Sequence, residues 1–322
     1  MLIKLWGVRG SIPTPLDTGE YRDKLRGVLR HALDAGLNAD SDINQFIEEL
    51  PPHLGRVFGG DTTCVCVEPS VDEAPVIIDC GTGLRRLGDA LMEGPCGRGE
   101  GIVRICFTHT HHDHIQGLPF FKPLYIPGNE IHFYSPLADL EARLVRQQID
   151  HYFPMPFENT ASRKYFYVLN EKQPLELDDG TQIDFQPLKH PGGSFAYRFR
   201  RGGASFIFAT DVEFTGEDML RMDATHPFFG RADLLVMDAQ YTLDDHFSRF
   251  DWGHTSVTMA VNCAARWDVK TLVLTHHEPS YSDARLMKNL QLAIEHKGNM
   301  NATRPQLHLA RQGMQFRVGP EK

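Results

Sequence analysis

The sequence lacks a long apolar run, a surplus of basic residues, and any repeated or low-complexity segment. No window of 18 residues is free of polar side chains, which argues against a membrane-spanning helix. Lysine and arginine total 33 against 42 aspartate and glutamate residues, a net charge of −9, whereas nucleic-acid-binding proteins usually present a basic face. We therefore expect no membrane partner and do not expect nucleic acid as the main partner.

Cysteine is scarce and scattered. The six cysteines lie mostly within apolar runs, and the Cys64-x-Cys66 spacing is that of neither a zinc ribbon nor a redox pair. Residues 1–6 read as a first strand and lack the apolar stretch and cleavage site of a secretory signal. We expect buried, reduced thiols and a cytoplasmic protein.

The chain instead has many short apolar segments that alternate with helical patterns. At 322 residues, with 41% hydrophobic and 23% charged residues, it has the composition of an ordinary globular enzyme. Apolar residues at helical spacing predict helices over 82–93 and 255–266. Strands are predicted at 2–6, 63–68, 75–79, 102–107, 130–134, 164–169, 182–186, 195–200, 204–209, 233–237, 271–275 and 314–318. Strand-rich halves flanked by helices suit an α/β fold, a four-layer αββα sandwich.

Two segments interrupt this alternation. Segment 16–56 carries two helical stripes, and segment 127–170 begins a helix at Ser135-Pro136 and ends in the aromatic stretch 152–157. We treat residues 1–322 as a single domain with insertions at about 16–56 and 127–170. Both insertions would pack on the core. The alternative is that the aromatic stretch overhangs the active site or forms a homodimer contact, because exposed aromatic patches mark such surfaces.

The most informative segment is 107–114, FTHTHHDH, which directly follows an apolar run. Imidazole and carboxylate groups are the usual ligands of zinc and related transition metals. In an extended or loop backbone, His109 and His111 project to the same side and could hold one metal, while Asp113 and His114 could hold a second. A glycine and a proline follow closely, so we predict a strand end and a loop rather than a helix. This excludes the helical His-Glu-x-x-His motif of zincins.

The pattern His-x-His-x-Asp-His after a buried strand resembles the signature of the metallo-β-lactamase-fold metallohydrolases. Four further pieces of that family pattern lie in matching order along the chain. They are the turn 77–83 around an aspartate, the histidine of 189–194, the aspartate of 208–211 and the histidine of 274–277. The resemblance covers most of the chain, from Lys4 to about Asp283.

The resemblance implies two divalent metal ions, with zinc as the first candidate and manganese or iron as alternatives. It implies that one ion is held by His109, His111 and His190, the other by Asp113, His114 and His276, and that Asp211 bridges them. Two such ions, about 3.5–4 Å apart, would hold a hydroxide as the nucleophile. Asp79 would orient a ligand histidine. His112 and His277, the second members of His-His pairs, would have other roles.

A further group of residues resembles the tRNase Z and phosphodiesterase branch of the family. There, an acidic residue at a strand end, here Asp238, pairs with a histidine that opens a helix, here His254. The resemblance implies that Asp238 orients His254 and that His254 protonates the leaving alkoxide, since a bare sugar alkoxide leaves poorly. The candidate catalytic residues are His254, Asp238 and Asp113. The structural alternatives are a helix-start hydrogen bond for His254 and a loop-capping role for Asp238.

The function favoured by these residues is a dinuclear-metal phosphodiesterase acting on a small phosphodiester, with cyclic nucleotides as the first candidates. Segments 10–15 and 120–124 resemble the bacterial small-molecule phosphodiesterases, and the long basic Gly/Pro-rich arm that grips tRNA is missing. A tRNA 3′-processing endonuclease shares the chemistry and stays an alternative. A lactamase or thioesterase would not need the Asp238 and His254 pair. A flavodiiron-type oxidoreductase usually carries glutamate in place of His111, and a non-catalytic binding protein would not need every ligand.

Overall fold

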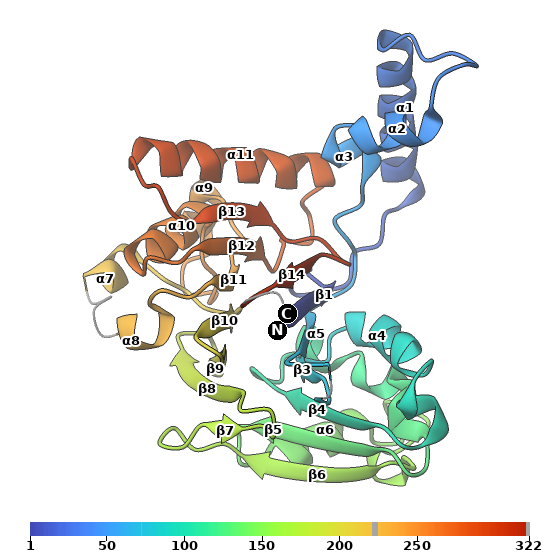
Figure 1. Cartoon of the computed structure of the whole chain (residues 1–322), viewed down its shortest axis with the longest axis vertical. Coiled ribbons are helices and arrows are strands. Elements are labelled where there is room, and N and C mark those ends of the chain that lie inside the picture. Colours follow the sequence, from blue (N-terminus) through green and yellow to red (C-terminus); the bar gives the residue numbers. More distant parts are fainter. Residues whose placement is uncertain (72, 221–224, 320–322) are drawn as a thin grey trace.

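The structure, a computed structural model, describes residues 1–71, 73–220 and 225–319. Across these ranges, two mixed β-sheets of seven strands each pack face to face, with helices on their outer faces (Figure 1). This is the four-layer αββα arrangement of an α/β fold, and the predicted fold class is confirmed. Among the described residues, no helix combines the length and apolar content that a membrane crossing requires.

The two sheets are formed mainly by the two halves of the chain. The first has the order β14-β1-β2-β3-β4-β5-β6 and the second β13-β12-β11-β10-β9-β8-β7. The first sheet comprises β1 (Leu2–Gly7), β2 (Cys64–Glu68), β3 (Val76–Ile78), β4 (Ile102–Cys106), β5 (Glu130–Ser135), β6 (Arg163–Val168) and β14 (Gln315–Arg317). The second comprises β7 (Leu175–Glu176), β8 (Gln182–Leu188), β9 (Ser194–Arg201), β10 (Ala204–Ala209), β11 (Leu234–Asp238), β12 (Thr271–Thr275) and β13 (Gln306–Leu309).

The helices of the described ranges lie outside the sheets or in the loops. They are α1 (Thr18–Asp34), α2 (Ile43–Glu49), α3 (Pro52–Gly55), α4 (Gly83–Leu91), α5 (His112–Ile115), α6 (Leu140–Gln147), α7 (Gly216–Met219), α8 (His226–Phe229), α9 (Leu243–Ser248), α10 (Val257–Arg266) and α11 (Asp283–Asn299). Helices α4 and α6 pack on the first sheet, and α10 and α11 pack on the second. Figure 1 shows α11 along the outer face of the second sheet.

Three apolar layers separate the four structural layers. Strand β10 shows how the sequence builds them, because successive side chains of a strand point to opposite faces. Phe206 and Phe208 pack between the sheets, while Ile207 and Ala209 pack against the helical layer of α10 and α11. All six cysteines lie among the described residues, and each is free and buried. Burial raises the pKa of the Cys66 thiol to about 12, consistent with a structural thiol.

All of the predicted strands are present, with ends shifted by at most two residues. Not predicted were the short strands β7 and β13 and the long helix α11. The start of α11 does carry a readable signal, since the Ser282 side chain accepts a hydrogen bond from the backbone N–H of Arg285 as an N-cap. The apolar stripe of α11 is interrupted by polar residues, which hides its period.

Three local expectations were wrong. The stretch after His111 forms a one-turn helix, α5, where a loop was predicted. The helix expected from Ser135-Pro136 begins only at Leu140, because Ser135 still pairs with Val168 in the sheet. Segment 127–170 is not wholly an insertion, since it supplies β5 and β6 to the first sheet.

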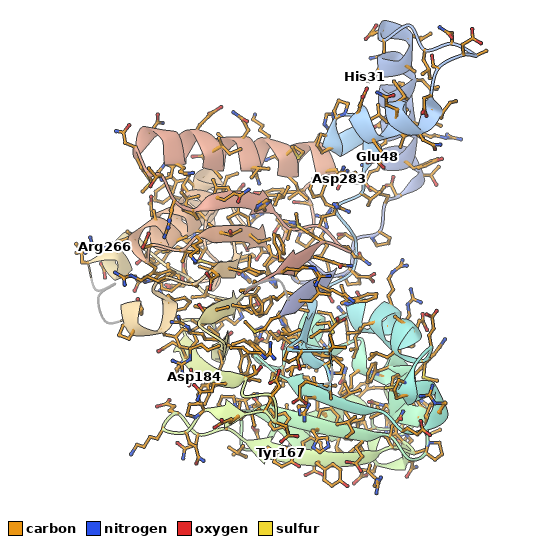
Figure 2. All side chains as sticks on the ribbon, viewed as in Figure 1. His31, Glu48, Tyr167, Asp184, Arg266 and Asp283 are labelled. Atoms are coloured by element: carbon orange, nitrogen blue, oxygen red, sulfur yellow. The ribbon has the colours of Figure 1, made fainter. Side chains whose placement is uncertain are left out.

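Segment 16–56 forms a helical arm, α1 and α2, that projects from the sandwich instead of packing on it (Figure 1). Neither helix contains a buried residue. Figure 2 shows His31 and Glu48 on the arm and Asp283 where it meets the body. The Lys24 ammonium pairs there with Asp283 at the start of α11. The arm is thus joined to the second half of the chain by charge pairing.

The loop after β1 is fixed to the second half of the chain by Arg9. This side chain is 4% exposed. Its Nε donates to the carbonyl of Gly59 at 3.0 Å, and its Nη1 donates to the carbonyls of Glu278 at 3.1 Å and Tyr281 at 3.0 Å. These bonds hold the loop after β1 against the segment that follows β12.

We predict that Arg9→Met destabilises the fold, because it leaves three carbonyls without this donor. Each buried polar group left unpaired costs about 1–3 kcal/mol. For a chain of this size, we expect a fall in Tm of about 5 °C or more, measured by differential scanning fluorimetry. Arg22→Met on the exposed face of α1 is the matched control and should leave Tm nearly unchanged. Equal Tm values for the two variants would contradict the role of Arg9.

Candidate metal centre

The site forms where the strand ends of both sheets meet. Strands β10, β11 and β12 run parallel to one another, as do β3 and β4, so the segments that follow them emerge at one edge. Asp79, Asp211 and His276 lie just after β3, β10 and β12, with positive φ values of 61°, 57° and 61°. This conformation costs about 1–3 kcal/mol for a residue other than glycine and is typical of functional sites. It turns each chain sharply at the edge of its sheet.

All seven predicted metal ligands come together at this edge. One group of potential ligand atoms is formed by His109, His111, His190 and Asp211, and a second by Asp113, His114, Asp211 and His276. Within each group, the potential ligand atoms lie within 4.8 Å of one another. Asp211 belongs to both groups, as a bridging residue would.

The Asp211 carboxylate faces histidines with both oxygens. Its Oδ2 lies 3.0 Å from Nε2 of His114, and its Oδ1 lies 3.3 Å from Nε2 of His276. Oδ1 also lies 3.6 Å from Nε2 of His190 and 3.8 Å from Nε2 of His109, which belong to the first ligand group. The carboxylate therefore stands between the two groups.

The second ring nitrogen of each buried histidine contacts a fixed partner. Nδ1 of His114 lies 2.8 Å from the carboxylate of Asp79, and Nδ1 of His190 lies 2.9 Å from the carbonyl of Gly253. Nδ1 of His276 lies 3.3 Å from the Thr63 hydroxyl. Such partners fix the ring orientation of metal-binding histidines and leave Nε2 free to coordinate.

The donor atoms at the centre of the site suit metal ions. Nε2 of His109, His114 and His276 and Oδ2 of Asp211 are buried, and none of them makes a hydrogen bond. Buried polar atoms are normally paired, and a set of unpaired ones that face one another is typical of a metal-binding site. Imidazole and carboxylate are ligand types that zinc, manganese and iron accept. The residues present fit such ions.

Burial and charge in the site keep His109 neutral and Asp211 ionised. Burial lowers the pKa of His109, and the positive charge of His114 lowers it further, which keeps the His109 imidazole neutral. Burial opposes ionisation of Asp211, but neighbouring positive charge, chiefly that of His114, holds the pKa of its carboxyl well below its usual range. Metal binding requires neutral imidazole and ionised carboxylate.

Asp238 and His254 form a buried pair beside this cluster. The His254 Nδ1 lies 2.8 Å from Oδ2 of Asp238, and the ring is 8% exposed. The ring stacks on His276 with centroids 5.0 Å apart and meets the ring of His190 at 5.3 Å. Burial lowers the pKa of His254, but the charge of Asp238 and its hydrogen bond outweigh this and raise it to about 8.

The Asp238 carboxylate is fully hydrogen-bonded. Its Oδ2 also accepts from the backbone N–H of Asp211 at 3.0 Å, and its Oδ1 accepts from the N–H groups of Thr255 at 3.1 Å and Gln240 at 3.2 Å. Asp238, His254 and His276 also lie close enough to hold a metal. Because four N–H groups already occupy the Asp238 oxygens, we interpret this group as a hydrogen-bonded pair.

His112 and His277 belong to neither ligand group, and Asp79 contacts the ligand candidate His114. His112 is exposed at the start of α5. His277 is buried, and its Nε2 lies 2.9 Å from the carbonyl of Ala310. Burial and the charge of Arg9 lower the pKa of His277 to about 3, so the ring is neutral. Asp79 orients His114, and it also accepts hydrogen bonds from Thr108.

Two contributors to the site were not predicted. The backbone N–H of Ser11 donates to Oδ2 of Asp113 at 2.9 Å. Gly253 has a φ of 87°, and a Cβ there would lie 2.3 Å from Nδ1 of His190. The sequence shows Gly253 beside His254, but the close approach of Gly253 to His190 arises only in the folded chain.

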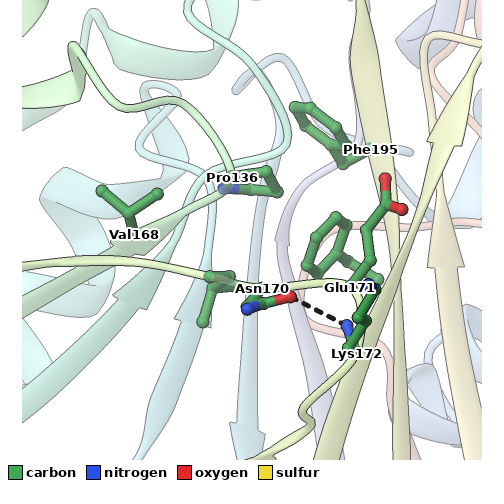
Figure 3. Close-up of a pocket in the computed structure, with 8 residues that line it drawn as sticks. Pro136, Val168, Asn170, Glu171, Lys172 and Phe195 are labelled. Carbon is green, nitrogen blue, oxygen red and sulfur yellow. Dashed lines mark hydrogen bonds between the residues drawn. The ribbon is translucent and has the colours of Figure 1, made fainter.

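The site is separate from the pocket in Figure 3, a hollow of about 530 Å³ between the end of β6 and strands β8 and β9. Its lining includes Glu171 and Lys172, and the Lys172 N–H donates to the Asn170 side chain. A second hollow of about 910 Å³ adjoins the metal motif at Gln116 and Gly117. Neither hollow is lined by a predicted ligand.

Comparison with known proteins identifies the family. Residues 75–277, more than half of the chain, match the model of a beta-lactamase superfamily domain. The chain belongs to the metallo-β-lactamase superfamily. It is also similar to proteins named Ribonuclease Z from Prochlorococcus marinus, with 24% identity to that of strain NATL1A over 56% of this chain and 72% of the relative.

Solved structures share this superfamily fold. The YhfI protein of Bacillus subtilis matches with a TM-score of 0.63 at 17% identity. The match covers 99% of this chain and 98% of the YhfI chain. Human tRNase Z, short form, has a TM-score of 0.57 at 17% identity, with 99% and 100% covered. A diphosphatase of the PhnP family has a TM-score of 0.56 at 18% identity, with 98% and 97% covered. At these identities, the likeness shows the fold, and the superfamily is one of metal-dependent hydrolases.

Proposed function

We propose that the protein is a dinuclear metal-dependent phosphodiesterase that hydrolyses a small phosphodiester, with cyclic nucleotides as the first candidates. The observation that supports the proposal is the hydrogen-bonded pair of Asp238 and His254, in which the His254 ring stacks on that of His276. Hydrolysis of an alkyl phosphodiester needs a proton donor for the leaving alkoxide. Hydrolysis of a lactam or thioester does not need this pair.

In this proposal, His109, His111, His190 and Asp211 would hold one ion, and Asp113, His114, Asp211 and His276 the other. When bound, such ions lower the pKa of water and neutralise charge on phosphoryl oxygens. The Ser11 N–H donates a hydrogen bond that orients the Asp113 carboxylate, and the Asp79 carboxylate orients the His114 ring.

His254 would serve as the proton donor through Nε2. Its Nδ1 is occupied by Asp238, which leaves Nε2 as the nitrogen that can face the substrate. The same Asp238 oxygen accepts from the N–H of Asp211, so the position of the proton donor is tied to that of the shared ligand. This link would hold the donor at a fixed distance from the scissile bond, as general acid catalysis requires.

A tRNA 3′-processing endonuclease is the second candidate, because the chain is similar to proteins named Ribonuclease Z. It would use the same residues on a larger substrate. The net charge of −9 disfavours binding to a polyanion. Turnover of cyclic nucleotides, linear dinucleotides and tRNA precursors by the purified protein would separate the two candidates. We further propose that the protein acts in the cytoplasm.

The ligand set predicts two metal ions per chain, since one tetrahedral ion uses only about four ligand positions. Elemental analysis of carefully purified protein should find close to two equivalents of zinc, manganese or iron. A reproducible value of one equivalent in fully active protein would contradict the dinuclear assignment.

Asp211→Asn should abolish metal retention or reduce turnover by several orders of magnitude. The substitution keeps the shape of the side chain but removes the charge that faces both ligand groups. Metal content and kcat are the measurements. His112→Ala is the matched control, because His112 lies in the same motif yet is exposed, and it should keep both metals and activity. Near-normal turnover of Asp211→Asn with both metals retained would place the bridge elsewhere.

His254→Ala should slow hydrolysis of a cyclic nucleotide by about 10²–10⁴-fold while both metals are retained. Bis(p-nitrophenyl) phosphate should lose far less, because p-nitrophenolate leaves without a proton. The kcat values for the two substrates and the metal content are measured on the same preparation. Equal losses on both substrates would mean that His254 positions the substrate or supports the fold. No loss on either would favour a carbonyl hydrolase.

A further inference from the structure

Around α9 lies a group of aromatic and cationic side chains that the proposed chemistry does not use. The guanidinium of Arg249 lies over the ring of Tyr241 at 4.9 Å and near the ring of Trp252 at 6.0 Å. We call Tyr241, Arg249 and Trp252 the arginine–aromatic clamp. Cation–π contacts of this length orient an arginine without neutralising its charge.

The clamp directly borders the site. The Tyr241 ring meets the ring of His254 edge-on, with centroids 5.7 Å apart. Trp252 precedes His254 by two residues, so their Cα atoms are at most about 7.6 Å apart. Gly253 lies between them, and its carbonyl lies 2.9 Å from Nδ1 of His190, one of the candidate metal ligands. Trp252 therefore belongs to the same short backbone segment as His254 and the Gly253 contact with His190.

Arg249 interacts with the charge of Asp245 only at longer range, whereas Lys189 makes close ion pairs. The Lys189 ammonium lies over the ring of Phe250 at 5.4 Å, but it is paired with Glu213 at 3.2 Å and Asp251 at 3.3 Å. For Arg249, no carboxylate oxygen lies within 4.0 Å of the guanidinium in the described part of the chain, and its Nη1 is buried without a hydrogen-bond partner. An arginine in this state is suited to bind an anion.

The Trp252 ring provides an exposed aromatic face, since the residue is 60% exposed. Exposed apolar surface that is rimmed by polar groups often marks a binding site. Stacking uses the flat face of a base and not its hydrogen-bonding edges, so any base can stack on such a ring. An aromatic face and an unpaired arginine, side by side, match the two parts of a nucleotide.

We propose that Trp252 stacks the base of a nucleotide substrate and that Arg249 binds an anionic oxygen of the same molecule. The assignment rests on the proposed phosphodiesterase function and narrows its substrate to base-containing phosphodiesters. Both are substrate-positioning residues, and neither takes part in bond breaking.

The test is equilibrium binding of adenosine 5′-monophosphate and ribose 5-phosphate to the zinc-loaded protein, measured by calorimetry. The two probes share the phosphate and ribose and differ in the base. The wild type should bind adenosine monophosphate about 10-fold or more tightly than ribose phosphate. Trp252→Ala should remove this difference and leave ribose phosphate binding unchanged, and Trp252→Phe should restore part of it. Arg249→Met should weaken both probes by a similar factor, with Arg249→Lys intermediate.

Phe247→Ala is the matched control, because Phe247 lies on α9 and is 72% exposed. It should keep the wild-type preference, and the Tm of every variant checks its folding. Equal binding of both probes by the wild type would overturn the proposal, as would a preference that survives Trp252→Ala or is lost equally in Phe247→Ala. Hydrolysis is assayed separately. A base preference without hydrolysis of any phosphodiester would contradict the proposed function alone, and hydrolysis without base preference would contradict the clamp alone.

Discussion

The hydrogen bonds of the Asp238 carboxylate constrain most of the site. A buried carboxylate is costly unless its oxygens are paired, and here four N–H groups pair with it. They come from the segment after β10, the segment after β11 and the residues that open α10. These three segments must therefore meet at one point, which fixes Asp211 and His254 relative to each other.

The two-sheet fold brings these three segments together. Parallel pairing of β10, β11 and β12 delivers their carboxyl ends to one edge, and β3 and β4 do the same in the facing sheet. The apolar layer between the sheets sets how far apart these edges lie. Positive φ at Asp211 and His276 is then tolerated, because a large buried core outweighs a local cost of about 1–3 kcal/mol per residue. The strain is a consequence of turning the ligands inward.

The sequence reveals those parts of the fold and site that depend on local pattern. Strands such as β10 and β12 are predicted because short apolar runs are typical of buried strands. The ligands after them are predicted because they resemble family motifs. The helix α5 is missed, because a single turn leaves no periodicity. The projecting arm is missed because amphipathic stripes predict helices but not the body on which they pack. The Ser11 bond to Asp113 and the unpaired charge of Arg249 are long-range outcomes of folding that neighbouring residues do not encode.

Metal ligands alone do not choose a substrate, since function depends on residues added to a shared fold. In this chain, the segment between α9 and α10 is where such residues meet the cluster, because the close contact of Gly253 with His190 holds it there. Beside that segment, Glu213 and Asp251 pair with Lys189, whereas Arg249 has no ion pair among the described residues. An unpaired, partly buried cation is unfavourable in the free protein, and a bound anion would relieve that cost. Arg249 is thus placed to select what binds beside the ligand residues.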